Sequence, residues 1–184
     1  MTNVARTEEA SLIAAAAAGD ATAFEALVRT HSGAVYAHAL RFFGDPGTAE
    51  DVVQEVFVKM YRSLAGFDGR AALSTWLYRV TRNVCLDMLR SGAQRPVPVD
   101  PVDIAITAQD DTAQTAVDNV GLERAMRALA PEDREALGAV TLFGLSYAEA
   151  AEVLGVPEGT VKSRVFRARR ALASAFYAKG GARS

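Results

Sequence analysis

The segment from residue 144 to residue 170 reads GLSYAEAAEVLGVPEGTVKSRVFRARR, and its pattern predicts two short helices joined by a tight turn. Ser146 and Glu149 have the spacing of a capping box, in which each side chain accepts a hydrogen bond from the other residue's backbone N–H. Gly155 marks the end of the first helix, because glycine adopts the left-handed conformation without penalty. Pro157 suits the first turn of the next helix, where an N–H is not needed. A short helix, a glycine turn and a basic helix are the parts of a DNA-binding helix-turn-helix.

The phase of the basic helix separates a packing face from a cationic face. At about 100° per residue, Val161, Val165, Ala168 and Leu172 share one side and would bury against the first helix. A basic run by itself more often marks a solvated helix. Here the cap, the turn glycine, the proline and the phase agree, and together they favour DNA binding. The candidate DNA-binding residues are Thr160, Lys162, Ser163, Phe166, Arg167 and Arg170.

The formal net charge of −2 conceals a basic end and an acidic middle. Residues 158–184 hold seven Lys or Arg against Glu158, and residues 91–122 hold five Asp against Arg95. Cys85 is the single cysteine, which excludes an intrachain disulfide and suits a reducing cytosol. No apolar stretch approaches the roughly 20 residues that a membrane helix needs, so we expect a cytoplasmic protein.

The N-terminal half has the 3.6-residue periodicity of packed helices. We expect a short helix over 7–18, a second one capped by Asp20, and a third over about 49–64 capped by Thr48. A fourth helix should begin at Ser74 or Thr75 and run to about residue 90. The solvent-facing side of the third helix carries Asp51, Gln54, Glu55, Val58 and Arg62. A solvated acidic face is the better interpretation of this segment alone, although Val58 in its middle is unusual and protein-binding surfaces mix apolar and charged groups in this way.

The outward side of the fourth helix carries Arg79, Arg82 and Asn83 within one turn. Cations hold phosphates, and an Asn amide can bond a base edge. A surface helix with a satisfied Asn is an equally good interpretation of this segment alone. Trp76 is better explained as a core anchor than as a stacking platform for bases.

From about Ser91 to Val117 the periodicity is lost, and prolines and aspartates predominate, which predicts a flexible acidic linker. Helices resume near Val117 and again at Pro131, with Glu132 and Asp133 placed where the helix dipole favours carboxylates. No alternating strand pattern is present. The predicted fold is all-α, with two small helical domains over 1–91 and 118–184 joined by a linker over 92–117.

The chain offers little catalytic or metal-binding chemistry. His31 and His38 are seven residues apart and lack further ligands at close spacing, so no metal site is predicted. No phosphate loop, nucleophile elbow or supported Cys/His pair is present. We therefore expect no cofactor and no enzymatic activity.

Taken together, these segments resemble the extracytoplasmic-function (ECF) sigma factors, group IV of the sigma-70 family, from about Gly19 to Tyr177. Four segments carry the resemblance, in order along the chain: 19–24 (GDATAF), 49–57 (AEDVVQEVF), 74–83 (STWLYRVTRN) and 157–170 (PEGTVKSRVFRARR). The second resembles region 2.2, the third resembles regions 2.3 and 2.4, and the last resembles the recognition helix of region 4.2. The family's two helical domains are sigma region 2 and sigma region 4.

The resemblance implies a partner for each surface. Region 2.2 would dock on the clamp helices of the RNA polymerase β′ subunit through Asp51, Gln54, Glu55 and Val58. Region 4 would recognise the −35 element with the basic helix and contact the β flap. The acidic linker would thread toward the polymerase active-site channel, and an anti-sigma factor is an expected regulator. Binding and melting of the −10 element would fall to Arg70, Ser74, Thr75, Arg79, Arg82 and Asn83.

Two other classes of protein remain as alternatives at this stage. A conventional helix-turn-helix transcriptional regulator would use the basic helix but would leave residues 49–90 without a purpose. An all-α adaptor that binds no DNA would leave the basic C-terminal end unexplained. The sigma-factor interpretation accounts for both features.

Overall fold

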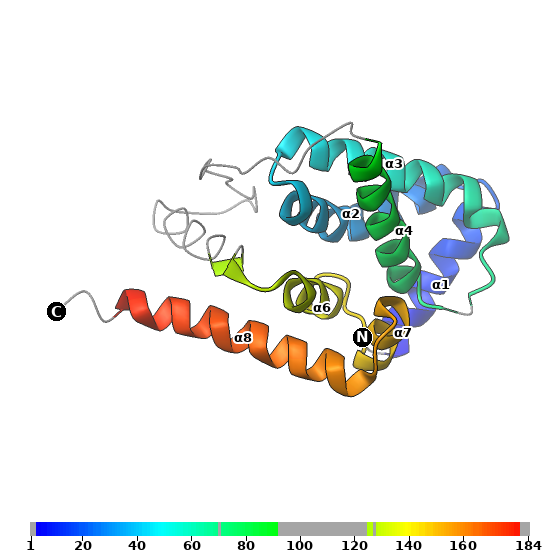
Figure 1. Ribbon diagram of the computed structural model, residues 1–184. Coiled ribbons are helices and arrows are strands. Elements are labelled where there is room, and N and C mark those ends of the chain that lie inside the picture. Colours follow the sequence, from blue (N-terminus) through cyan, green and yellow to red (C-terminus); the bar gives the residue numbers. More distant parts are fainter. Residues whose placement is uncertain (1–2, 70, 92–124, 127, 181–184) are drawn as a thin grey trace. The chain divides into compact units, whose positions relative to one another are not determined.

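The computed structural model describes residues 3–69, 71–91, 125–126 and 128–180 of the chain, and these residues are organised as helices without a strand (Figure 1). The chain divides into two compact units, Met1–Val97 and Pro98–Ser184. The all-α prediction is confirmed. The predicted flexible linker over 92–117 and the helix expected near Val117 lie outside the described residues.

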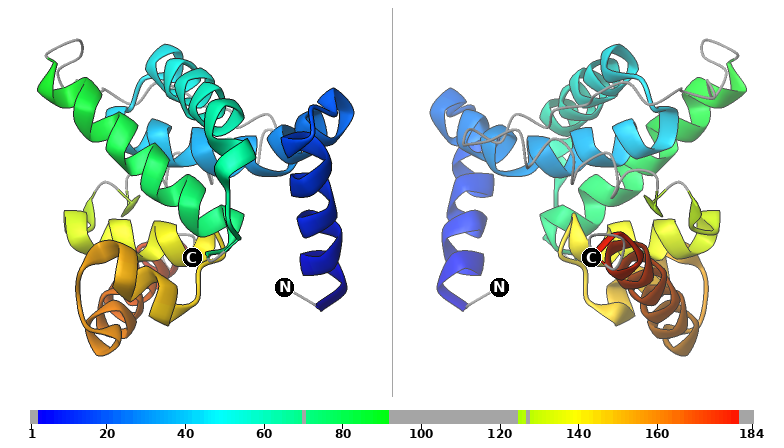
Figure 2. Two further views of the ribbon diagram at one scale, coloured as in Figure 1. Left: turned by 90° about the vertical axis from the view of Figure 1, so that its right-hand side faces the viewer. Right: turned by 90° about the vertical axis from the view of Figure 1, so that its left-hand side faces the viewer.

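The first unit consists of α1 (Asn3–Ala17), α2 (Ala21–Phe43), α3 (Pro46–Ser63), the short 3-10 helix η1 (Leu64–Gly66) and α4 (Leu73–Arg90). Helices α2, α3 and α4 pack on one another in all three pairs. Helix α1 stands at a steep angle to α2 (Figure 2) and also contacts η1. The core of this unit is formed mainly by aliphatic side chains with one buried tyrosine: Leu27, Val35, Val52, Val56, Met60, Leu73, Leu77 and Tyr78.

Local capping explains where the first helices begin and end. The Asp20 carboxylate accepts hydrogen bonds from the backbone N–H groups of Thr22 and Ala23, which confirms the predicted cap of α2. Helix α2 ends at Gly44, whose φ of 75° is left-handed. The predicted Thr48 cap of α3 is wrong. Asp45 caps this helix instead, and its carboxylate accepts a hydrogen bond of 2.7 Å from the Thr48 N–H.

The start of α4 also differs from the prediction. The helix begins at Leu73 with Ala72 as its N-cap, and Ala72 makes no side-chain capping bond. Neither Ser74 nor Thr75 is therefore the cap. The Ala72 carbonyl accepts hydrogen bonds from the N–H groups of Thr75 and Trp76, and these backbone bonds begin the helix.

The second unit consists of α6 (Pro131–Thr141), α7 (Tyr147–Leu154) and α8 (Glu158–Gly180). Pro131 is the first residue of α6, as predicted, because a proline at this position loses no helical hydrogen bond. All three helices contact one another. Their shared core contains mainly small and aliphatic side chains: Leu129, Ala136, Leu137, Phe143, Leu145, Ala150, Val161, Val165 and Ala168.

Candidate nucleic-acid interface

Helices α7 and α8 form the predicted helix-turn-helix. The Glu149 N–H donates to Ser146 Oγ at 3.2 Å, and the Ser146 N–H donates to Glu149 Oε2 at 2.9 Å, so the capping box is complete. Gly155 ends α7 with a φ of 67°, and a Cβ there would meet nothing within 4 Å. The left-handed backbone, and not crowding, therefore explains this glycine.

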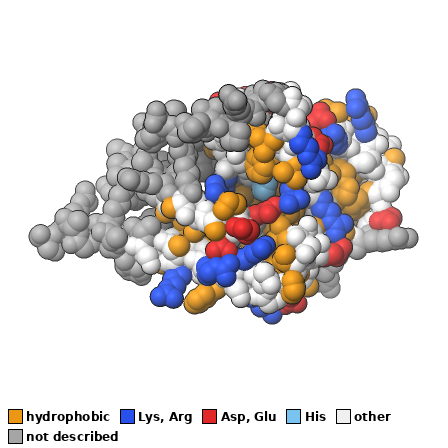
Figure 3. All heavy atoms as spheres, viewed as in Figure 1, with side chains coloured by type: hydrophobic (Ala, Val, Ile, Leu, Met, Phe, Trp, Pro, Cys, Tyr) orange, Lys and Arg blue, Asp and Glu red, His pale blue; other side chains and the backbone are white. Residues whose placement is uncertain are grey.

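The predicted division of α8 into two faces is confirmed. Val161, Val165 and Ala168 are buried against the rest of the unit, while Leu172 is partly exposed. The predicted DNA-binding side is open to solvent at Lys162, Ser163, Phe166, Arg167 and Arg170, and Thr160 is partly exposed. In Figure 3, blue Lys and Arg side chains follow the line of α8, with hydrophobic side chains between them.

Phe166 is the most unusual residue of this face. Its side chain is 66% exposed, although a phenylalanine on a helix that merely packs would turn toward the core. It lies among cations on a protruding helix. An aromatic or aliphatic group in such a place can contact the methyl group of thymine in the major groove.

Lys162 is held by acidic and aromatic neighbours. Its ammonium lies 2.6 Å from Glu158 Oε1 and 5.8 Å from the centroid of the Tyr147 ring. The hydrogen bond to Glu158 raises the pKa of Lys162 above its ordinary value. Glu158 precedes Lys162 by four residues, so this pair follows from helical spacing and could have been predicted.

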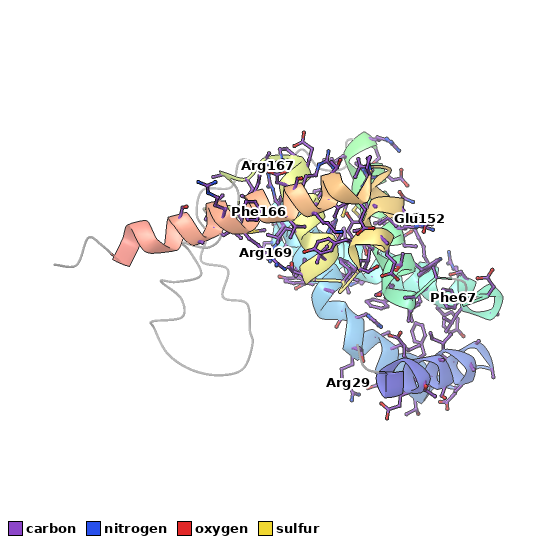
Figure 4. The ribbon with its side chains drawn as sticks, turned by 90° about the horizontal axis from the view of Figure 1, so that it is seen from below. Arg29, Phe67, Glu152, Phe166, Arg167 and Arg169 are labelled. Atoms are coloured by element: carbon purple, nitrogen blue, oxygen red, sulfur yellow. The ribbon has the colours of Figure 1, made fainter. Side chains whose placement is uncertain are left out.

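Arg167 makes a different kind of contact. Its Nε donates to Asp133 Oδ2 at 3.0 Å and its Nη2 donates to Asp133 Oδ1 at 2.7 Å, so α6 and α8 are joined across 34 residues of sequence. The hydrogen bond to Asp133 raises the pKa of Arg167. Figure 4 shows Arg167 and Arg169 on opposite sides of α8. Sequence reasoning missed Asp133, because the helix dipole already explained a carboxylate at that position.

The −10 residues predicted on α4 are only partly on the surface. Asn83 is exposed, Ser74, Arg79 and Arg82 are partly exposed, and Arg70 lies outside the described residues. Thr75 is 2% exposed, which contradicts its predicted place on the outward face. Helix α4 packs against both α2 and α3, so its buried arc is wider than one stripe and includes Thr75.

Aromatic packing supports the beginning of α4. The Phe67 and Trp76 rings meet edge to face with centroids 6.5 Å apart. Both rings are partly exposed. Trp76 thus packs against the segment that precedes α4 but is not part of the buried core, so its predicted role as a core anchor is only partly met.

The outward face of α3 combines charge with exposed apolar surface. Asp51, Gln54 and Glu55 are exposed, and Val58 is 42% exposed. Tyr61 is 67% exposed and was missed by the sequence analysis, although its spacing of seven residues from Gln54 places it on the same face. Its ring meets Phe24 edge to face, with centroids 5.3 Å apart.

The single cysteine of the chain lies inside the first unit. Cys85 is fully buried, and burial raises the pKa of its thiol to about 12. Within the described ranges, no group of three His, Cys, Asp or Glu side chains is arranged to hold a metal ion. Across the same ranges, no helix combines the length and the apolar character that crossing a bilayer would require.

Comparison with protein families assigns both units to one class. Residues 27–95 match the model of sigma-70 region 2, and residues 120–172 match that of sigma-70 region 4. Two solved complexes have similar folds. CnrH bound to the cytosolic domain of CnrY is 29% identical with a TM-score of 0.65 over 93% of this chain and 98% of that one. RpoE of Bartonella quintana bound to the anti-sigma factor NepR is 26% identical with a TM-score of 0.67 over 84% of this chain and 96% of that one.

Curated relatives narrow the class. The ECF RNA polymerase sigma factor SigM of Mycobacterium tuberculosis is 38% identical over 165 residues, which cover 90% of this chain and 83% of that protein. The ECF RNA polymerase sigma-E factor of Escherichia coli K12 is 38% identical over 168 residues, covering 84% and 86%. The chain belongs to the ECF RNA polymerase sigma factors of the sigma-70 family.

Proposed function

We propose that this sigma factor is a dissociable subunit that brings core RNA polymerase to promoters by contacting DNA at two places. The exposed side of α8 binds the −35 element in the major groove, and the surface of α4 with the preceding loop binds and opens the −10 element. The chain supplies recognition, and the polymerase carries out the chemistry. The site of action is therefore the cytoplasm, where the polymerase works.

The observation that carries this proposal is the exposed face of α8. A helix-turn-helix presents its second helix to the major groove. In this protein the second helix is α8. Its exposed side offers Lys162, Arg167 and Arg170 for phosphates or guanine edges, Ser163 for a polar contact, and Phe166 for a thymine methyl. Thr160 lies in the first turn of α8, close to Lys162 and Ser163 in sequence.

For the −10 element, Arg79, Arg82 and Asn83 remain the candidates on α4, together with Ser74 at its start. Arg70 keeps its proposed role in the loop. Thr75 is withdrawn as a direct DNA contact in this conformation, because a residue that is 2% exposed presents almost no surface to a ligand. Its proposed effect on the −10 element would be through the packing of α4.

The outward face of α3 is the proposed surface for the polymerase β′ clamp helices. Asp51, Gln54 and Glu55 surround Val58, and Tyr61 extends the apolar part. Aromatic residues are enriched in the buried centre of protein interfaces, and charges at the rim guide association. A regulator that acts without polymerase has no use for this surface.

Domain organisation and regulation complete the proposal. Residues 1–91 form region 2, residues 92–117 the linker, and residues 118–184 region 4, which also contacts the β flap. The linker threads toward the active-site channel. An anti-sigma factor holds the protein inactive, and the Bartonella quintana relative, which was solved with such a partner, supports this role.

Transcription from a genomic library tests the function directly. Purified protein is added to core RNA polymerase and a library of genomic DNA fragments, and the 5′ ends of the run-off transcripts are sequenced. We expect new start sites preceded by two shared sequence elements, with core alone as the control. A conventional regulator would bind duplexes without core and would add no start sites, and that result would overturn the proposal.

A further inference from the structure

The ion pair between Asp133 and Arg167 is the most specific polar contact of the second unit. Both carboxylate oxygens accept a hydrogen bond from one guanidinium, at 3.0 and 2.7 Å. The Asp133 side chain is only 10% exposed, while that of Arg167 is 58% exposed. One partner is therefore fixed in the protein, and the other extends from it into solvent.

Asp133 is rigidly placed. It lies in the first turn of α6, where its N–H donates to the Ala130 carbonyl at 3.0 Å. A carboxylate that is mostly withdrawn from water needs strong hydrogen-bond donors, and a bidentate arginine supplies two. Its buried position fixes the direction in which Arg167 can be held.

The geometry of the guanidinium leaves it able to bind a second ligand. An arginine carries five N–H donors in one plane, and the bonds to Asp133 use one on Nε and one on Nη2. These two donors define the side edge of the guanidinium. The end edge, formed by Nη1 and Nη2, retains the pair of donors that guanine O6 and N7, or a phosphate, can accept.

Arg167 lies on the exposed side of α8 with Ser163 and Arg170, and next to Phe166. An unrestrained arginine loses much rotamer entropy when it is immobilised at an interface. A partner that already fixes the side chain removes part of that cost. The negative charge of the carboxylate also repels DNA phosphates, so the two effects of Asp133 on DNA binding have opposite signs.

We propose that Asp133 is a positioning residue for promoter recognition, which holds Arg167 by its side edge so that the end edge meets the DNA. This inference rests on the proposed function of α8. Asp133 itself does not contact DNA. The opposite possibility, that Asp133 competes with DNA for Arg167, predicts effects of opposite sign.

The test uses the full chain assembled with core polymerase and a promoter fragment obtained from the run-off library. Four proteins form a double-mutant cycle: wild type, Asp133→Asn, Arg167→Gln and the double variant. We expect Asp133→Asn to weaken promoter binding by about 3- to 10-fold, because the released Arg167 side chain must then lose its rotamer entropy when DNA immobilises it. In the Arg167→Gln background the same change should have almost no effect.

Three controls separate positioning from loss of stability. Ala136→Gly destabilises α6 at a fully buried position three residues after Asp133 that contributes neither hydrogen bond of the pair, and it should leave promoter binding unchanged once the protein is folded. Core affinity, measured without DNA, should be equal in all variants. If Asp133→Asn fails to fold, Arg167→Lys takes its place in the test. Lysine keeps the positive charge but lacks the planar guanidinium with its paired donors. Arg167→Lys should weaken promoter binding and leave its dependence on salt equal to that of the wild type.

Tighter binding by Asp133→Asn, with a steeper dependence on salt, would show competition and overturn the inference. An undiminished effect in the Arg167→Gln background, or equal effects of Asp133→Asn and Ala136→Gly, would also overturn it. All of these results leave the sigma-factor function intact. Absence of new start sites with the wild-type protein would instead overturn the proposed function and this inference together.

Discussion

His38 is a buried imidazole whose charge state links the stability of the first unit to pH. It is 8% exposed, and its ring meets that of Tyr78 edge to face with centroids 5.5 Å apart. Burial, assisted by the positive charges of Arg41 and Arg82, lowers the pKa of His38 from 6.5 to about 4. The folded protein therefore keeps His38 neutral at pH values where the unfolded chain protonates it.

We expect the unfolding free energy to fall as the pH is lowered from 6.5 to 4, because the unfolded state binds the extra proton. The loss at pH 5 should be about 2 kcal/mol, since each unit of pKa difference corresponds to about 1.4 kcal/mol. Urea unfolding at pH 7 and pH 5 measures it. His38→Gln provides the control, since it removes this titration; an identical loss in that variant would contradict the assignment to His38.

Cys85 illustrates how burial controls reactivity at the scale of one residue. The thiolate is the reactive form, and burial raises the pKa of this thiol to about 12. In the native protein at pH 8, labelling by a thiol reagent should be at least about 100-fold slower than in denaturant. Rapid native labelling would show that the first unit opens readily around α4.

At the scale of the element, the capping box decides how firmly α7 begins. Ser146→Ala removes the acceptor of the Glu149 N–H and should destabilise the second unit by about 1 kcal/mol. Hydrogen exchange of the α7 amides and urea unfolding both report this change. Ser174→Ala is the matched control, because its hydroxyl only bonds the Arg170 carbonyl within α8. Equal losses in the two variants would exclude a special role for the cap.

The α3 face offers a second prediction at this scale. Asp51→Arg combined with Glu55→Arg reverses two exposed charges, and the second change replaces the carboxylate that lies 2.9 Å from the Lys59 ammonium with another cation. Affinity for core polymerase should fall by about tenfold or more, because the two arginines reverse the charges that the proposed interface is built to complement. Titration of labelled protein with core measures this affinity.

Glu8→Arg combined with Glu25→Arg reverses two exposed charges on α1 and α2 and is the matched control. Its affinity for core should remain near that of the wild type. Circular dichroism verifies that both double variants are folded. Equal losses in the two would indicate a general effect of charge and would remove α3 from the interface.

At the scale of the whole molecule, the charges are divided between functions. The net charge is −2, yet the exposed side of α8 is basic, whereas α3 exposes Glu50, Asp51 and Glu55 together with Lys59 and Arg62. Lys162→Gln should weaken promoter binding by the assembled polymerase and lower the slope of log affinity against log salt by about one. Its affinity for core in the absence of DNA should not change.

Arg29→Gln is the comparison for this prediction. Arg29 is an exposed cation of the first unit, and it pairs with Glu25 at 2.7 Å as Lys162 pairs with Glu158. Its loss should leave the slope unchanged. The same slope in both variants would mean that the measured salt dependence arises elsewhere on the protein.

The sequence by itself determined the features that depend on residues a few positions apart. Asp20, Ser146, Gly155 and Pro131 act within one turn of the helix that they begin or end, and the buried side of α8 follows from helical periodicity. The exposed side of α8, which is the proposed DNA-binding face, was predictable for the same reason. The Thr48 cap failed because the nearby Asp45 is the better acceptor one turn earlier.

Tertiary structure alone decided two features of the candidate site. Thr75 is buried because α2 and α3 cover two sides of α4, and periodicity gives the direction of a side chain but not the number of neighbouring helices. Asp133 meets Arg167 across 34 residues because α6 and α8 pack together. Local rules already explained Asp133 as a helix-dipole carboxylate. Its partner depends on long-range packing, which no pattern within one helix records.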